Sequence, residues 1–171
     1  MRSGREWCGS GWVVAGVWVL ATVLLAGCQS VPMGHVGGRV PAQKRMALAQ
    51  DGSHSATYRT EDLVIDYRYS RNQSLLELSG SIRFADSIRY SFRRVDGFHA
   101  DVIFMNESGV VVASQALTTG SSDSSDSPIM FKTSVTVSQD VVAISFAYTG
   151  NAVATGGGSG ARMGFWDNPA R

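Results

Sequence analysis

Cysteine is scarce in this sequence of 171 residues: Cys8 and Cys28 lie near the N-terminus and none follows. A disulfide within the long segment after Cys28 is therefore excluded, and so is a zinc site built on paired cysteines. Whatever folds after Cys28 has to be held together by its apolar core.

Charge of one sign is also lacking. The chain has 15 Lys and Arg residues against 14 Asp and Glu, and no block of five or more basic residues. Nucleic-acid binding depends on clustered positive charge, so we expect no nucleic-acid partner.

Motifs that carry chemistry are missing as well. His35, His54 and His99 are far apart and form no spaced pair, so we expect no metal site. Asp123 and Asp126 lie in a serine-rich stretch without the spacing of an EF-hand loop. Neither a Gly-x-Ser-x-Gly nucleophile motif nor a phosphate-binding glycine loop occurs between a strand and a helix. We therefore expect no catalytic residue and no cofactor, and the chain is not predicted to be an enzyme.

One long apolar run is present, at residues 12–25. Arg2 and Arg5 precede it, and its 14 residues include no charge. That length suits the apolar part of an export signal and is short of the roughly 20 residues that span a bilayer as a helix.

The run ends in Leu25, Ala26, Gly27 and Cys28, which resembles the lipobox of bacterial lipoprotein signal peptides. The resemblance implies cleavage between Gly27 and Cys28, a diacylglycerol thioether on Cys28 and an acyl chain, typically palmitate, on its new amino group. The alternatives are a signal anchor in which Cys28 is incidental, or an ordinary signal peptide cleaved near Ala26. Inner-membrane lipoproteins have Asp directly after the lipidated cysteine, and this chain has Gln29 there. By the same resemblance, we therefore expect the protein in the cell envelope, at the periplasmic face of the outer membrane.

Removal of residues 1–27 would leave 144 residues, enough for one domain. Arg2, Arg5 and Glu6 would be lost, so the mature chain would carry 13 basic and 13 acidic residues and be formally neutral.

The remaining chain divides into three parts by composition. Residues 28–60 are polar and broken by Pro and Gly, which predicts a flexible tether; partial packing on the domain is the alternative. Residues 61–150 alternate between apolar and polar positions, which predicts β-strands. Residues 151–171 are predicted to form a glycine-rich tail. The strands are predicted at residues 63–69, 76–84, 88–92, 98–104, 110–116, 129–137 and 141–148, and the stretch 118–127 is predicted to be a mobile loop.

Seven short strands without a long helix predict an all-β fold, a two-layer antiparallel sandwich of immunoglobulin-like type. An up-and-down barrel is the structural alternative. The segments 98–116 and 143–150 weakly resemble small sandwich domains of uncharacterised bacterial lipoproteins, and that resemblance implies no functional residues.

Two pairs of residues are candidates for binding. Arg89 and Arg93 would share a strand face with Ser91 and form a stripe for anionic lipid or glycan, or simply keep an exposed strand soluble. Phe165 and Trp166 follow the glycines and would either cap the sandwich or anchor a partner.

The function predicted from these observations is that of a membrane-anchored envelope lipoprotein acting as a non-catalytic protein-interaction or structural module. Its N-terminal lipid would anchor it in the membrane, and it would bind another envelope protein through an edge strand or loops. The alternative is a lipoprotein that binds small ligands or glycans on the arginine-bearing face. A hydrolase is the least favoured reading.

Overall fold

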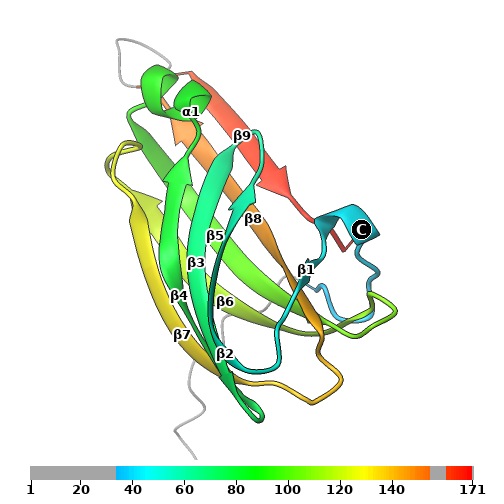
Figure 1. Cartoon of the computed structure of the whole chain (residues 1–171). Helices are drawn as coiled ribbons and strands as arrows, with labels where there is room; N and C mark the ends of the chain where they lie inside the picture. The colour runs from blue at the N-terminus through cyan, green and yellow to red at the C-terminus, as the bar shows by residue number, and fades with distance from the viewer. Residues whose placement is uncertain (1–33, 155–160, 171) are drawn as a thin grey trace, which may run out of the picture. The chain divides into compact units, whose positions relative to one another are not determined.

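A computed structural model describes residues 34–154 and 161–170, so Cys28 and the signal segment lie outside the described residues. Strands dominate (Figure 1), and every strand pair is antiparallel. In chain order the elements are η1 (Ala42–Lys44), β1 (Met46–Ala47), β2 (Gly52–Arg59), β3 (Leu63–Asn72), β4 (Leu75–Phe84), α1 (Asp86–Ser91), β5 (Arg94–Met105), β6 (Val111–Ser122), β7 (Ile129–Thr136), β8 (Ala143–Val153) and β9 (Arg162–Asp167).

The strands form two sheets. One has the order β2-β3-β4-β7, and the other has the order β1-β8-β5-β6 with β9 also paired to β8. Strands β3-β4-β7 and β9-β8-β5-β6 follow the immunoglobulin order, in which the chain changes sheet between β4 and β5 and again on either side of β7. The predicted immunoglobulin-like sandwich is confirmed.

The core lies between the sheets and follows the predicted alternation. Leu63, Ile65 and Tyr67 of β3 point inward, and so do Leu76 and Leu78 of β4. At the centre, the ring of Phe146 in β8 lies 5.1 Å from that of Tyr67 and 5.4 Å from that of Tyr58 in β2, measured between centroids. Burying each such side chain contributes about 1.5–3 kcal/mol, which is how the domain is held without disulfides.

The predicted tether is corrected for residues 34–60. Strand β2 pairs with β3 along its whole length, from Gly52 opposite Arg71 to Arg59 opposite Val64. Strand β2 lies at the edge of its sheet, and of its side chains only Tyr58 is buried. The strand is therefore held mainly by backbone hydrogen bonds. Without an apolar face it shows no alternation, so its sequence looks like a linker.

Residues 34–41, which we call the arm, also pack on the domain. The arm runs over the outer face of the five-stranded sheet. Val40 is fully buried in a small second cluster with Ile103, Met105, Val111 and Ala143. Gly37 and Gly38 exchange backbone hydrogen bonds with Val111, each 2.9 Å long. Partial packing, the alternative to a free tether, therefore describes this segment.

The predicted strand at 88–92 is wrong, because the structure forms helix α1 there. Only Ile88 is buried, and Tyr90 is 78% exposed, so the two do not share a buried face. The helix joins β4 of one sheet to β5 of the other. Asp86 near its start and Arg89 in its last turn form an ion pair of 3.1 Å and suit the helix dipole.

Two segments predicted to be irregular contain strand. Residues 118–122 of the predicted loop belong to β6, and the Ser125 hydroxyl is buried and donates to the Phe92 carbonyl at 2.6 Å. Residues 162–167 of the predicted tail form β9, paired with β8 from Tyr148 to Val153.

Candidate functional site

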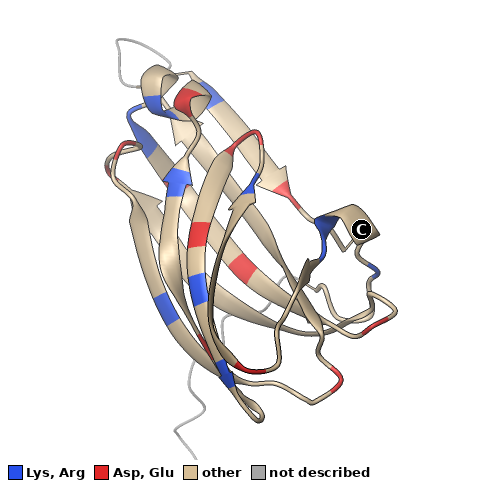
Figure 2. Cartoon of the chain, in the orientation of Figure 1, with Lys and Arg blue, Asp and Glu red and all other residues tan. Residues whose placement is uncertain are grey.

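The predicted arginine stripe does not form. Arg89 lies on α1 and contacts the carboxylates of Asp86 and Asp126, each at 3.1 Å, while Arg93 lies in the turn that follows the helix. The two arginines therefore do not share a strand face. Asp126, considered above as a calcium ligand, is paired with Arg89 instead. Figure 2 shows basic and acidic residues interspersed over the described part of the chain.

Phe165 and Trp166 point to opposite sides of β9. Phe165 is buried against Phe84, Phe98 and Tyr148, so it caps the core as one of the two predictions stated. Trp166 is 62% exposed. Its position opposite Thr149 of β8 places it on the outer face of the five-stranded sheet.

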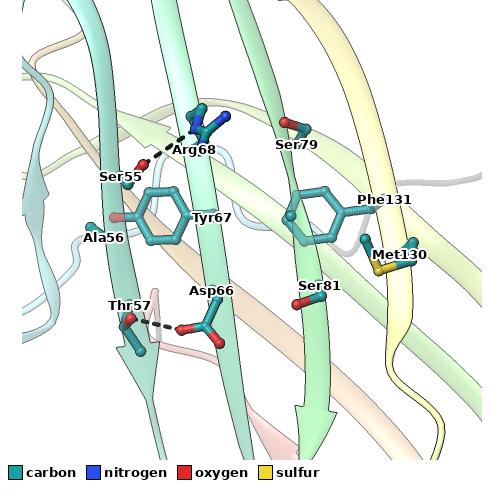
Figure 3. Close-up of a pocket in the computed structure, with 11 residues that line it drawn as sticks. Ser55, Ala56, Thr57, Asp66, Tyr67, Arg68, Ser79, Ser81, Met130 and Phe131 are labelled. Carbon is teal, nitrogen blue, oxygen red and sulfur yellow. Dashed lines mark hydrogen bonds between the residues drawn. The ribbon is translucent and has the colours of Figure 1, made fainter.

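The outer face of the four-stranded sheet carries an open groove, which we call the serine groove (Figure 3). Its main hollow has a volume of about 530 Å³, and a smaller one of about 190 Å³ continues along the strands. Its polar lining is mostly small hydroxyl side chains, namely Ser55, Thr57, Ser79 and Ser81 of the main hollow and Ser53 and Ser70 of the smaller one.

Charges flank the serine groove without filling it. Asp66 accepts a hydrogen bond from Thr57 at 2.7 Å and pairs with Arg83 at 2.6 Å. These two contacts, that from Thr57 foremost, lower the pKa of Asp66, so it is a carboxylate at neutral pH. Arg68 lies opposite Ser55 across the groove floor. Hydroxyls between a carboxylate and a guanidinium are groups that bind hydroxylated small molecules.

Gly80 shapes the floor of the groove. It pairs with Phe131 of β7, whose ring covers it from the core side, and a Cβ at Gly80 would lie 2.8 Å from that ring. An aromatic side chain packed over a cross-strand glycine compensates for the missing side chain. The backbone of β3 also approaches Gly80 closely, since a Cβ there would clash with the Asp66 carbonyl oxygen, and the strand register is regular on both sides.

Three core tyrosines have raised pKa values, and burial is the main cause for each. The pKa of Tyr67 rises to about 12, and those of Tyr58 and Tyr148 rise as well. The Tyr148 hydroxyl donates to the Asp62 carboxylate at 2.9 Å, and its oxygen lies 2.8 Å from the Thr60 hydroxyl. Each hydroxyl remains protonated at neutral pH, which fits a structural role in joining elements.

A buried polar cluster, which we call the Asp101 cluster, joins both ends of the described chain to the outer face of the five-stranded sheet. Asp101 of β5 is 1% exposed; its two carboxylate oxygens lie 2.9 Å from His99 Nε2 and 3.5 Å from His35 Nε2, contacts that are ion pairs when the imidazoles are protonated and that lack hydrogen-bond geometry. The Nδ1 atom of His99 lies 2.7 Å from Thr119 Oγ1, and the Nδ1 atom of His35 lies 3.1 Å from Asn168 Oδ1. The cluster therefore fixes the arm and the C-terminal segment to β5 and β6.

The sequence pattern partly concealed this cluster. His99 and Asp101 are two apart in a predicted strand and so share a face, which was a usable signal. The predicted tether includes His35, and nothing in the sequence shows that the arm covers this face of β5. Among residues 34–154 and 161–170, no group of three His, Cys, Asp or Glu side chains is arranged to hold a metal ion.

Strand β6 provides the longest edge of the sandwich. In the described chain it pairs only with β5, apart from the two hydrogen bonds between the arm and Val111. Its 12 residues include no Lys, Arg, Asp, Glu or Pro. Proteins usually protect edge strands with such residues, with short length or with bulges, and β6 has only bulges, at Val112 and Leu117.

The other edges are better protected. Strand β7 carries Lys132 and follows Pro128, β9 has six residues with a charge at each end, and β2 ends in Arg59. The outer backbone of β6 from residue 113 to residue 122, which we call the β6 edge, is therefore the edge best suited to accept another strand. Residues 118–122 of this edge lie within the predicted loop.

We predict that Asp101→Ala loosens the arm, because both imidazoles lose their buried carboxylate. The free energy of unfolding should fall by about 1–3 kcal/mol, the range for losing a contact with a buried charged group, as measured by urea unfolding. Trypsin should cleave faster after Arg39. Asp96→Ala is the control: its ion pair with Arg94 is partly exposed and worth at most about 1 kcal/mol. Equal effects of the two substitutions would contradict the role of Asp101 in holding the arm.

Comparison of the chain with protein-family models, with curated proteins and with solved structures finds no match. No helix within residues 34–154 and 161–170 is long and apolar enough to cross a membrane. The functional proposals therefore depend on the residues and contacts of this chain.

Proposed function

We propose that this protein is a lipid-anchored envelope protein whose sandwich binds an extended segment of another envelope protein by strand addition at the β6 edge. The observation that carries the proposal is a 12-residue edge strand without charge or proline. Main-chain hydrogen bonds to such an edge supply affinity, and the alternate side chains supply specificity. The function is non-catalytic.

The anchor in this proposal is Cys28, followed by Gln29, at the periplasmic face of the outer membrane. A single acyl chain binds membranes only marginally, at about 0.8 kcal/mol per buried CH₂, whereas a diacyl thioether with an added N-acyl chain holds firmly. Because no cysteine follows Cys28, the lipid would occupy the only thiol of the mature chain.

We predict that Cys28→Ser abolishes lipid modification and releases the chain from the membrane fraction. Mass spectrometry of the mature N-terminal peptide from the wild-type chain should show the mass of the acyl groups. If the Cys28→Ser chain stays membrane-bound at unchanged size, Cys28 is not the anchor and a signal anchor is the correct reading.

We also predict that positive charge on β6 abolishes partner binding. In Ser114→Lys with Gln115→Lys, adjacent lysines lie on opposite faces of the edge, which disfavours pairing with a further strand. Crosslinking in native envelopes followed by mass spectrometry identifies the partner, and the variant should lose that crosslink at least tenfold, which corresponds to about 1.4 kcal/mol.

The matched control places the same charges on the edge strand of the other sheet, as Thr133→Lys with Ser134→Lys. This variant should keep the crosslink, and circular dichroism should show both variants folded. Loss in the β7 variant with retention in the β6 variant would overturn the assignment to β6.

The second candidate function is binding of a small hydroxylated ligand or glycan, and the serine groove favours it. Its position differs from that predicted from the arginines, since it lies over Asp66 and Arg68. We predict that a ligand found by thermal shift with an oligosaccharide panel loses its effect in Ser79→Trp, where an indole fills the hollow. An unchanged shift in Ser79→Trp would place the ligand elsewhere.

A further inference from the structure

We infer that the outer face of the five-stranded sheet rests on the lipid surface, with Trp166 and Val36 in contact with the membrane interface. This inference rests on the proposed lipid anchor at Cys28. A flexible tether of residues 28–60, as predicted from the sequence, would instead let the domain stand clear of the membrane in any orientation.

The first argument is the length of chain available. The arm is fixed to the domain from His35 onward, because His35 is buried beside Asp101 and Asn168. Gly34 is the sixth residue after Cys28. Even fully extended, six residues span about 20 Å, against about 110 Å for the 33-residue tether. The lipid therefore holds the domain within about 20 Å of the bilayer.

The second argument is where the arm begins. His35 lies over Asp101 of β5, and Gly37 bonds to Val111 at the start of β6. Both contacts place the first described residues on the outer face of the five-stranded sheet. The four-stranded sheet lies on the far side, because packed sheets are about 10 Å apart. To turn that sheet toward the membrane, the six residues would have to pass around the whole sandwich.

The third argument is the position of Trp166 on this face. Trp166 of β9, Thr149 of β8, His99 of β5 and Thr119 of β6 lie in one cross-strand row. Strands are about 4.8 Å apart, so the Trp166 backbone lies about 10 Å from that of His99, which shares Asp101 with His35. Trp166 is therefore well within the radius that the tether allows.

Exposed apolar groups mark both ends of this region. Trp166 is 62% exposed and Val36, on the arm, is 64% exposed. Tryptophan is enriched where membranes meet water, because its ring is amphipathic. Arg39 on the arm is also exposed, which suits an anionic headgroup. The exposed Met130 lies on the four-stranded sheet and has no such tether beside it.

The mature chain offers a direct probe. The other tryptophans, Trp7, Trp12 and Trp18, lie in the segment expected to be removed, so Trp166 would be the only one left. The lipidated protein is reconstituted into phosphatidylcholine vesicles with brominated acyl chains, which quench indole emission on contact. We expect roughly a twofold loss of emission relative to unbrominated vesicles, since an indole at headgroup level touches these chains.

The matched control moves the probe to the other sheet. In Trp166→Phe with Ser55→Trp, the indole stands on the exposed outer face of the four-stranded sheet, and its emission should be unchanged by the brominated lipid. Circular dichroism verifies that both chains are folded. Quenching at position 55 equal to that at Trp166, or no quenching at Trp166 in a vesicle-bound protein, overturns the inference.

The failure of the anchor is distinguishable from the failure of the orientation. If mass spectrometry shows Cys28 unmodified and the protein does not float with vesicles, the proposed anchor fails and the orientation fails with it. If the protein is acylated and floats but Trp166 is not quenched, the anchor stands and only the orientation is wrong.

Discussion

The outer face of β5 and β8 has to be covered, and much of the structure depends on that constraint. From Ala143 to Tyr148 every residue of β8 is buried, on both faces of the strand. The four-stranded sheet covers the inner face. The arm and the C-terminal segment cover the outer face, and the Asp101 cluster fixes them there. Residues that would otherwise have served as a tether are packed on the domain in this way, which would bring the domain toward the proposed anchor at Cys28.

The sequence predicted the elements whose stability comes from an apolar face. Strands β3, β4, β5 and β7 alternate and the first half of β8 is almost wholly apolar. All five were found at their predicted places, although β5 begins four residues earlier and β8 ends five residues later than predicted. Strand β2 escaped prediction because it buries only Tyr58 and is held by backbone pairing. Residues 88–92 were predicted to form a strand because five residues fit period two as well as a helical turn. Helix α1 in fact spans the six residues Asp86–Ser91, and only tertiary packing decides between the two conformations.

The candidate sites show the same division. Trp166 was singled out as an aromatic residue without an evident core, and it lies exposed, whereas its neighbour Phe165 is buried. The arginine stripe failed because it was built on the strand that is a helix. The Asp101 cluster combines residues 66 positions apart, from His35 to Asp101. Such juxtapositions depend on topology, which local patterns of residue type do not contain.

The two proposed surfaces are compatible with one orientation at the membrane. If the outer face of the five-stranded sheet lies on the lipid, β6 runs along the side of the sandwich with its edge parallel to the bilayer. A partner strand lying there would itself be close to the membrane, so a membrane-bound protein with an extended segment fits better than a freely diffusing one. The serine groove would then face away from the bilayer, open to the aqueous compartment. If Cys28 carries the proposed lipid, the short distance between lipid and domain would narrow the class of partner for each surface.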